Sequence, residues 1–143
     1  MKILIINGPN LNMLGIRESH LYGTKSYQDL VEYLTNYAKK YQDELEIFQS
    51  NGEKEIIEKI QQAYFDQVKA LIINPGAFGH YSYAIRDAIT SVGIRCIEVH
   101  LTDIDHREPF RKTSVIRDIC EQSFYGKGFI SYQEALDYLH KNK

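Results

Sequence analysis

Short and nearly unbroken apolar runs constrain the fold of this chain more than any other feature. A strand with one wet face alternates apolar and polar residues, whereas a strand covered on both faces does not need to. Four runs rich in Ile, Leu and Val have the length of strands, and a weaker fifth follows: KILIIN (2–7), ELEIFQ (44–49), ALIINP (70–75), IRCIEVH (94–100) and EQSFYG (121–126). These runs predict strands buried between two layers.

Helical patterns separate the runs. Apolar residues recur at helical spacing in four segments: 26–42, 53–66, 81–92 and 131–140. Ser26 with Asp29, and Ser131 with Glu134, have the spacing of capping boxes, and Gly93 predicts the end of the third helix. Strands that alternate with helices form right-handed βαβ units. We therefore predict an α/β fold, a flavodoxin-like five-stranded parallel sheet with helices on both faces, in a single domain over residues 1–143.

The composition excludes several classes of function. The 17 basic and 19 acidic side chains are interspersed, with a formal net charge of −2, so no basic face for nucleic acid is predicted. No apolar run approaches the ~20 residues that span a membrane, and none forms the core of a secretory signal. Cys96 and Cys120 lack the close spacing of a zinc site or a disulfide framework. These features predict a reduced, cytoplasmic protein.

Polar residues follow the predicted strands, at the sheet edge where open α/β folds bind ligands. The segments after the first, third and fourth strands carry carboxamides, two histidines and several arginines. GPNLNMLG has neither the Lys-Ser/Thr of a P-loop nor the spacing of a dinucleotide loop. His80, His100 and His106 could converge on a metal, but histidines separated by whole elements are usually structural or catalytic. We therefore predict no metal and no cofactor.

Three segments carry a resemblance to a known family: NGPNLNMLGIRESHLYG (7–23), NPGAFGHYSYAIRDA (74–88) and EVHLTDIDHREPFR (98–111). In order and with matching gaps, they strongly resemble the type II 3-dehydroquinate dehydratases, from the first strand to at least Ser114. The resemblance implies reversible dehydration of 3-dehydroquinate to 3-dehydroshikimate through an enolate, in the shikimate or quinate pathway. It implies no metal, no organic cofactor and a homododecamer built as a tetramer of trimers. The alternatives are a lyase for a related hydroxyketone and a non-catalytic flavodoxin-like binding module.

The resemblance also implies roles for individual residues. Tyr22 would be the base with Arg17 beside it, His100 would protonate the leaving hydroxyl, and Asn10 would hold a water that stabilises the enolate. The remaining residues would bind substrate: Asn74, His80 and Arg111 its hydroxyls, the amides of Leu101 and Thr102 its carboxylate, and Asp87 a neighbouring subunit's site.

A tyrosine base requires a cation close by. At a reference pKa of about 10, only about 0.1% of a tyrosine is phenolate at neutral pH, and lowering the pKa by three units requires about 4 kcal/mol. One arginine at about 4 Å supplies roughly that at an effective dielectric near 20. Arg17 lies five residues before Tyr22, and Gly15 and Gly23 would let the loop close over substrate.

His100 has the opposite requirement to Tyr22, because it must carry a proton at neutral pH. Glu98 lies two residues earlier on the same strand face, and we expect its carboxylate to orient His100 and stabilise the imidazolium. Each candidate also has a structural interpretation: solvated charge for the arginines, Asp87 and Glu98, turn formers for Asn10 and Asn74, a surface tyrosine for Tyr22, and the partner of a loop carbonyl for His80.

The sequence departs from the family pattern after His100. Asp103 and Asp105 stand where an amide and an imidazole are common, so we expect two carboxylates close to an anionic substrate. His106 is a candidate to replace the displaced imidazole.

Overall fold

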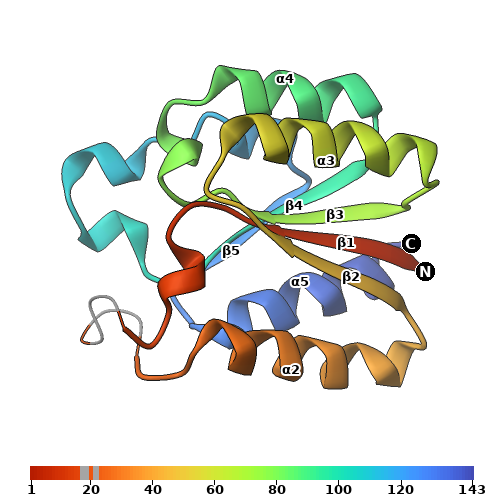
Figure 1. Ribbon diagram of the computed structural model, residues 1–143, viewed down its shortest axis with the longest axis horizontal. Coiled ribbons are helices and arrows are strands. Elements are labelled where there is room, and N and C mark those ends of the chain that lie inside the picture. Colours follow the sequence, from red (N-terminus) through yellow and green to blue (C-terminus); the bar gives the residue numbers. More distant parts are fainter. Residues whose placement is uncertain (17–19, 21–22) are drawn as a thin grey trace.

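The computed structural model describes residues 1–16, 20 and 23–143. Its sheet contains five strands: β1 (Lys2–Asn7), β2 (Glu44–Gln49), β3 (Ala70–Asn74), β4 (Arg95–His100) and β5 (Gln122–Tyr125). Four α-helices alternate with them in the described residues: α2 (Tyr27–Ala38), α3 (Glu53–Phe65), α4 (Tyr83–Val92) and α5 (Phe129–Lys141). All five predicted strands and all four predicted helices are present (Figure 1).

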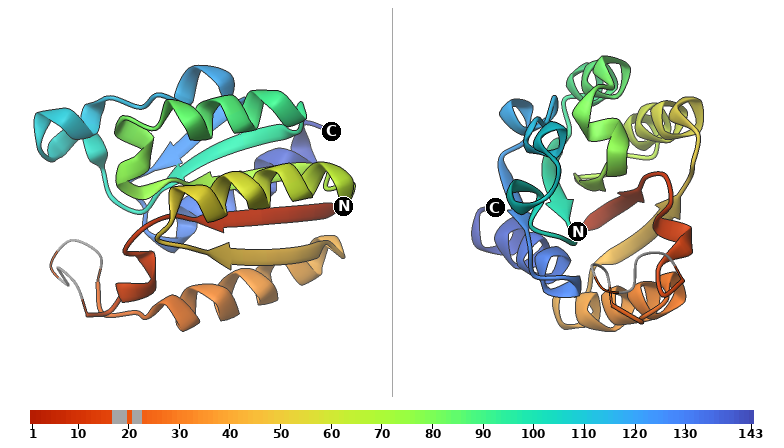
Figure 2. Two further views of the ribbon diagram at one scale, coloured as in Figure 1. Left: turned by 45° about the horizontal axis from the view of Figure 1, so that its top comes forward. Right: turned by 90° about the vertical axis from the view of Figure 1, so that its left-hand side faces the viewer.

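The sheet is parallel throughout, with the strand order β2-β1-β3-β4-β5. In the centre, Ile5 of β1 lies opposite Ile47 of β2 and Ile72 of β3. Helices α2 and α5 cover one face of the sheet, and α3 and α4 cover the other (Figure 2). The predicted five-stranded parallel sheet with helices on both faces is therefore confirmed.

Two apolar cores explain why the strands lack alternation. Ile3 and Ile5 of β1 pack into the core beneath α2 and α5, whereas Leu4 and Ile6 pack into the core beneath α3 and α4. These four side chains are at most 1% exposed. Successive residues of a strand point to opposite faces, so a strand between two cores must be apolar at every position.

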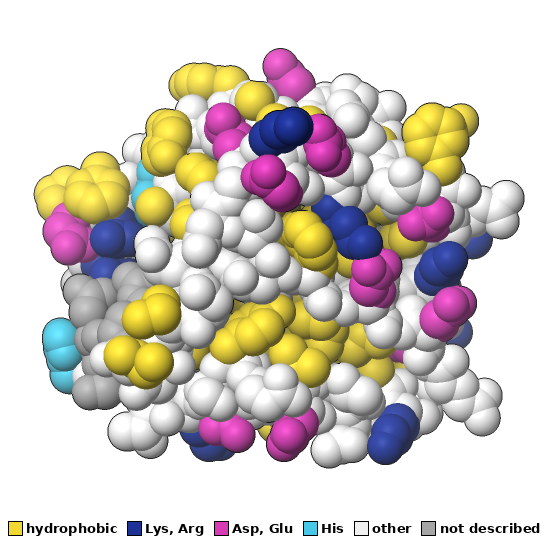
Figure 3. All heavy atoms as spheres, viewed as in Figure 1, with side chains coloured by type: hydrophobic (Ala, Val, Ile, Leu, Met, Phe, Trp, Pro, Cys, Tyr) yellow, Lys and Arg dark blue, Asp and Glu magenta, His cyan; other side chains and the backbone are white. Residues whose placement is uncertain are grey.

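The β2 edge of the sheet is less completely covered. β2 pairs only with β1, and its Leu45 and Ile47 are half-buried against the core beneath α2. Figure 3 shows apolar side chains at the surface between β2 and α2. Within the residues described, none of the helices is long and apolar enough to cross a membrane.

One of the two predicted capping boxes is wrong. Ser26 and Asp29 form the expected reciprocal pair at the start of α2. Helix α5, however, begins at Phe129, so Ser131 lies inside its first turn, where it is buried and its hydroxyl accepts the amide hydrogen of Lys127. Glu134 instead forms an ion pair of 2.8 Å with the Lys127 ammonium. The segment before Ser131 folds into the helix, and spacing alone did not reveal this.

The helix ends and loops bring the strand ends close together. Gly93 ends α4 with a φ of 63°, as expected for a left-handed C-terminal residue. After β1, the amide of Gly8 donates to the carbonyl of Asn74 at 2.8 Å. A Cβ at Gly8 would lie 2.4 Å from the carbonyl oxygen of Pro75, so only glycine allows the loops after β1 and β3 to approach this closely.

Candidate active site

A pocket of about 90 Å³ opens at the carboxyl edge of the sheet. Its walls come from the loops that follow β1, β3 and β4, three strands that are adjacent in the sheet. This is the position at which open α/β sheets bind ligands. The pocket is small and polar, and it brings together residues that are up to 102 positions apart in the chain, from Pro9 to Arg111.

Asn10 forms the β1 side of the pocket. It has a φ of 71°, in the left-handed region that asparagine tolerates better than most residues. Its backbone amide donates to the side-chain oxygen of Asn51, which follows β2, at 3.0 Å. The backbone of Asn10 is thus fixed by a neighbouring strand end while its own side chain is exposed.

Asn74 is held from behind by a buried tyrosine. The Asn74 amide donates to the Tyr132 hydroxyl at 2.9 Å, and that hydroxyl donates to the side-chain oxygen of Asn7 at 2.5 Å. The Asn74 oxygen accepts the amide hydrogen of Gly76 at 3.2 Å. Tyr132 comes from α5 and is fully buried, so a side chain of the protein core fixes Asn74 in the pocket.

His80 closes the β3 side of the pocket. Its Nδ1 lies 2.7 Å from the carbonyl oxygen of Thr113, so Nδ1 carries the hydrogen and Nε2 is the acceptor of the neutral ring. Partial burial lowers the pKa of His80, against the opposing effect of the Thr113 carbonyl, and the nearby charges of His100 and Arg111 lower it further. The neutral ring can both bind a hydroxyl and remain fixed by the loop.

His100 and Glu98 form a buried pair at the end of β4. The His100 Nε2 lies 3.1 Å from Oε2 of Glu98, and Glu98 is fully buried while His100 is 6% exposed. Since Nε2 donates to the carboxylate, the rest of the His100 ring is presented to the pocket, which it lines. The expected contact between Glu98 and His100 is present.

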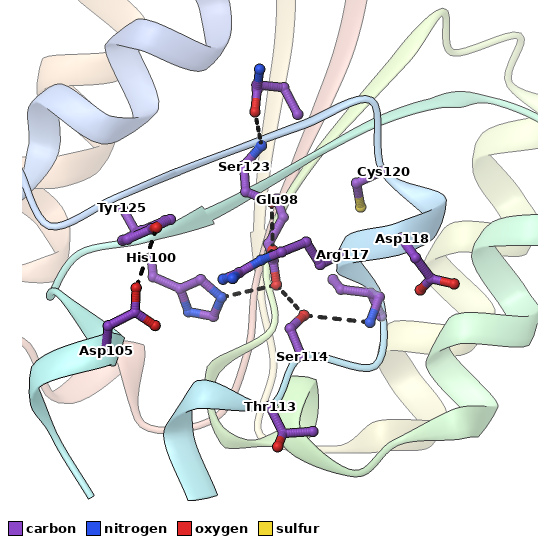
Figure 4. A network of polar contacts seen from close by, with 12 residues as sticks. Glu98, His100, Asp105, Thr113, Ser114, Arg117, Asp118, Cys120, Ser123 and Tyr125 are labelled. Carbon is purple, nitrogen blue, oxygen red and sulfur yellow. Dashed lines mark hydrogen bonds and ion pairs between the residues drawn. The ribbon is translucent and has the colours of Figure 1, made fainter. Parts of the chain in front are cut away.

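Glu98 is ionised although it is buried. Figure 4 shows it surrounded by His100, Ser114, Arg117 and Ser123. The Ser114 hydroxyl donates to Oε2, whereas the Ser123 hydroxyl and the Arg117 Nε donate to Oε1 at 2.7 and 3.1 Å. Burial raises the pKa of Glu98, but the hydrogen bonds and the charge of His100 outweigh it and lower that pKa to about 2. The carboxylate is therefore an anion at neutral pH, next to His100.

Arginines form the remaining wall. Arg111 and Arg107 both line the pocket, and Nε of Arg111 pairs with Glu108 at 2.6 Å. Nη1 of Arg107 lies 3.5 Å from the hydroxyl of Thr102, and its side chain is 8% exposed. Thr102 and Leu101, which follow His100, also line the pocket. This cationic wall suits an anionic ligand.

The structure thus brings most predicted site residues into one place. Those that line the pocket are Asn10, Asn74, His80, His100, Leu101, Thr102 and Arg111, and Glu98 supports His100 from behind. Asp87 is exposed on α4 and is not part of the pocket wall among the described residues. Arg17 and Tyr22 lie outside the described residues.

Two groups of site residues were missed from the sequence. Arg107, one of several arginines after the fourth strand, is not among the predicted site residues, and neither are Ser114, Arg117 and Ser123, which bind Glu98. A sequence signal existed for Glu98, a charge within an apolar strand that requires buried partners. Nothing in the sequence identified those partners.

Asp103 and Asp105 alternate along the chain with the pocket residues Thr102, Ile104 and Arg107, and the expectation that they lie close to an anionic substrate stays a prediction. Within the described part of the chain, neither carboxylate lines the pocket. Asp103 accepts the amide hydrogen of Asp105 at 3.2 Å and pairs with Nδ1 of His106 at 2.6 Å, whereas Asp105 lies 3.4 Å from the hydroxyl of Tyr125. His106 is exposed and also lies outside the pocket wall. Asp103 stands just before the short 3-10 helix Ile104–His106, and its side chain caps that helix.

Metal ligands do not converge in the described part of the chain. Among its residues, no group of three or more His, Cys, Asp or Glu side chains is arranged to hold a metal ion. His80 and His100 share the pocket, but each has a protein partner on one ring nitrogen.

The fold and the pocket define the class of protein, a flavodoxin-like α/β protein with a histidine-containing polar site at the carboxyl edge of its sheet. The family model described as "Dehydroquinase class II" matches residues 1–140. A 3-dehydroquinate dehydratase from Caldicellulosiruptor bescii is 54% identical over 135 residues, which cover 94% of this chain and 93% of that protein. The chain belongs to the class II dehydroquinase family, and the resemblance predicted from the sequence is confirmed.

Solved structures agree with this assignment. The type II dehydroquinase from Butyrivibrio crossotus is 50% identical, with a TM-score of 0.96 over 98% of this chain and 97% of that chain. The type II dehydroquinase from Propionibacterium acnes is 38% identical, with a TM-score of 0.94 over 99% and 97%. The flavodoxin-like architecture is therefore shared with these enzymes.

Proposed function

We propose that this chain catalyses the reversible dehydration of 3-dehydroquinate to 3-dehydroshikimate through an enolate, as a metal-independent hydro-lyase. The family membership and the relatives named 3-dehydroquinate dehydratase support this reaction. They do not favour a lyase for a related hydroxyketone or a non-catalytic binding module. The observation that carries the proposal is the buried His100–Glu98 pair at a polar, cationic pocket in a chain of this family.

The first step is removal of a proton. Tyr22, as phenolate, takes a hydrogen from the carbon next to the ketone, and the electron pair of that C–H bond forms the enolate. Arg17 keeps Tyr22 ionised, and a water bound by Asn10 donates to the enolate oxygen. Directed donors at the developing charge are the usual source of such stabilisation.

The second step is loss of the hydroxyl. The enolate reforms the ketone, a carbon–carbon double bond forms, and the carbon–oxygen bond to the leaving hydroxyl breaks. His100 gives its proton to that hydroxyl, which leaves as water, and Glu98 compensates the charge of the imidazolium while it exists. A general acid positioned in this way contributes about 10²-fold to 10⁴-fold to the rate.

The remaining pocket residues bind substrate. Asn74, His80 and Arg111 contact its hydroxyls, and the backbone amides of Leu101 and Thr102 bind its carboxylate. The fixed tautomer of His80, with its hydrogen on Nδ1, leaves Nε2 as an acceptor for a hydroxyl. The cationic wall of Arg107 and Arg111 supports binding of an anionic substrate.

We further propose that the chain, as one domain over residues 1–143, assembles as a homododecamer of four trimers in the cytoplasm. Asp87 then reaches the pocket of a neighbouring subunit. The exposed face of α4 supports a contact between subunits, because Tyr83 lies one helical turn before Asp87 and is 67% exposed, and Tyr81 just before the helix is 59% exposed. Light scattering of active enzyme tests the assembly, and an active monomer contradicts it.

Absorbance of the conjugated enone product tests the reaction. Purified protein is mixed with 3-dehydroquinate, and Tyr22→Phe and His100→Asn are compared with the parent. We expect kcat to fall by about 10²-fold to 10⁴-fold in both variants. Tyr64→Phe is the matched control, because Tyr64 is exposed at the C-terminal end of α3, which leads to the amino end of β3, and is not among the described residues that line the pocket. A parent protein that produces no enone refutes the proposed reaction, and a fully active Tyr22→Phe variant refutes the proposed base.

A further inference from the structure

Arg117 binds the carboxylate that supports His100, from outside the pocket. It begins the short 3-10 helix Arg117–Ile119, between β4 and β5. Its Nε donates to Oε1 of Glu98 at 3.1 Å, whereas Oε2 accepts from His100. The two oxygens of Glu98 thus divide between the two cations, and the hydroxyls of Ser114 and Ser123 add one donor to each oxygen.

Aromatic packing fixes the Arg117 guanidinium. Its central carbon lies 5.2 Å from the centre of the Tyr125 ring, a cation–π distance. In the sheet, Tyr125 of β5 is the register partner of His100, and Ser123 is the register partner of Glu98. Arg117 therefore lies beside Tyr125 and Ser123, the two β5 residues that are paired with His100 and Glu98, as Figure 4 shows.

We propose that Arg117 is a positioning residue for the dehydration, which acts on His100 through Glu98. This inference rests on the proposed role of His100 as proton donor. Arg117 is not among the described residues that line the pocket, so its effect must pass through the carboxylate. It holds Oε1 so that Oε2 faces His100, and its charge offsets part of the negative charge that His100 experiences.

Several other titratable or charged side chains lie near His100, but they are placed differently from Arg117. His80, Arg107 and Arg111 share the pocket with His100, and Tyr125 lies beside it on β5. Nearby Asp103 is paired with His106, and Asp105 with Tyr125. Among these side chains, Arg117 is the cation that binds Glu98 directly, as His100 does.

Removal of the Arg117 charge therefore has a defined sign. With Arg117 replaced by a neutral residue, the negative charge of Glu98 acts on His100 without this counter-charge, which favours the protonated ring. The alkaline limb of the kcat profile, at which the general acid loses its proton, then moves to higher pH. Loss of the hydrogen bond that orients Glu98 lowers kcat at the same time, because a misplaced acid transfers its proton less efficiently.

The experiment measures kcat, KM and their pH profiles in the full-length protein for Arg117→Gln and Arg117→Lys. We expect Arg117→Gln to lower kcat about tenfold, to leave KM within about twofold, and to raise the alkaline limb by about one pH unit. Arg117→Lys retains the charge, so its alkaline limb stays near that of the parent while kcat remains reduced.

Arg95→Gln is the matched control. Arg95 lies on the same strand as Glu98 and forms a two-point pair with Glu121 at 2.7 and 2.9 Å, away from the pocket. Its loss tests the general cost of removing an arginine–glutamate pair, and we expect the kcat profile to be unchanged. A shifted limb in Arg95→Gln overturns the specific role of Arg117.

Two further outcomes separate this inference from the proposed function. An alkaline limb that is unmoved in Arg117→Gln, or equally moved in Arg117→Lys, overturns the role of Arg117 while His100→Asn still identifies the acid. A His100→Asn variant with the parental kcat overturns the proposed acid, and the inference about Arg117 with it.

Discussion

Glu98 gives the most direct link between pH and the stability of this fold. Its pKa is lowered from 4.5 to about 2, because the hydrogen bonds and the charge of His100 outweigh the opposing effect of burial. Each pKa unit corresponds to about 1.4 kcal/mol, so ionised Glu98 contributes on the order of 3 kcal/mol to the free energy of unfolding. The pKa is depressed in the folded state. The contribution is therefore fully present above pH 4.5 and is lost as the pH falls toward 2.

The measurement compares the parent with Glu98→Gln, in which the titrating group is absent. Urea unfolding is followed by far-UV circular dichroism at several pH values from 6 to 2.5, at one protein concentration. We expect the pH dependence of the free energy of unfolding to be larger in the parent, by about 2.5 kcal/mol over this range. Other carboxyls with lowered pKa values, such as Asp118 and Glu121, titrate in both proteins and cancel in the comparison.

Glu121→Gln provides the control for a carboxyl at the surface. Glu121 pairs with Arg95 but is accessible to solvent, and exposed pairs contribute at most about 1 kcal/mol. Its replacement should therefore change the pH dependence much less than replacement of Glu98. If the parent and Glu98→Gln lose stability in parallel between pH 6 and 2.5, the carboxylate is not held as an anion by its four donors, and the reasoning fails.

Two further predictions concern the contacts that shape the pocket. Gly8→Ala should lower the free energy of unfolding by roughly 3 kcal/mol, because its Cβ would meet the Pro75 carbonyl. Gly93→Ala, in open space at a φ of 63°, should lower it by only about 1 kcal/mol. Equal losses in urea unfolding would contradict this prediction. Tyr132→Phe leaves the Asn74 amide without its buried partner, so we expect a loss of about 2 kcal/mol in stability and an increased KM. An unchanged KM would show that Tyr132 does not position Asn74.

Much of the fold was predictable because the relevant signals are local. The apolar runs identified the strands, and the burial of β1 between two cores shows why its residues do not alternate. Parallel strands share one carboxyl edge, so the residues after β1, β3 and β4 had to be neighbours once the topology was known. Asn10, Asn74 and His100 line one pocket for that reason.

Local spacing failed where a contact depends on the path of a loop. Ser131 and Glu134 have the spacing of a capping box, yet the helix begins two residues before Ser131. Asp103 and Asp105 follow His100 closely in the chain, but their carboxylates bind His106 and Tyr125 and are not among the described residues that line the pocket. Side-chain direction in such a segment changes with each backbone torsion, and residue type alone does not fix it.

The sequence by itself determined the layers of this protein and the edge of the sheet at which its chemistry takes place, because hydrophobic period and strand direction are properties of short segments. Only the tertiary structure decided which side chains surround Glu98. Arg117 and Ser123, which bind that carboxylate, lie 19 and 25 residues after Glu98 in the chain. These loop and sheet contacts form only when the whole domain has folded. A buried anion must find donors wherever the packed chain provides them.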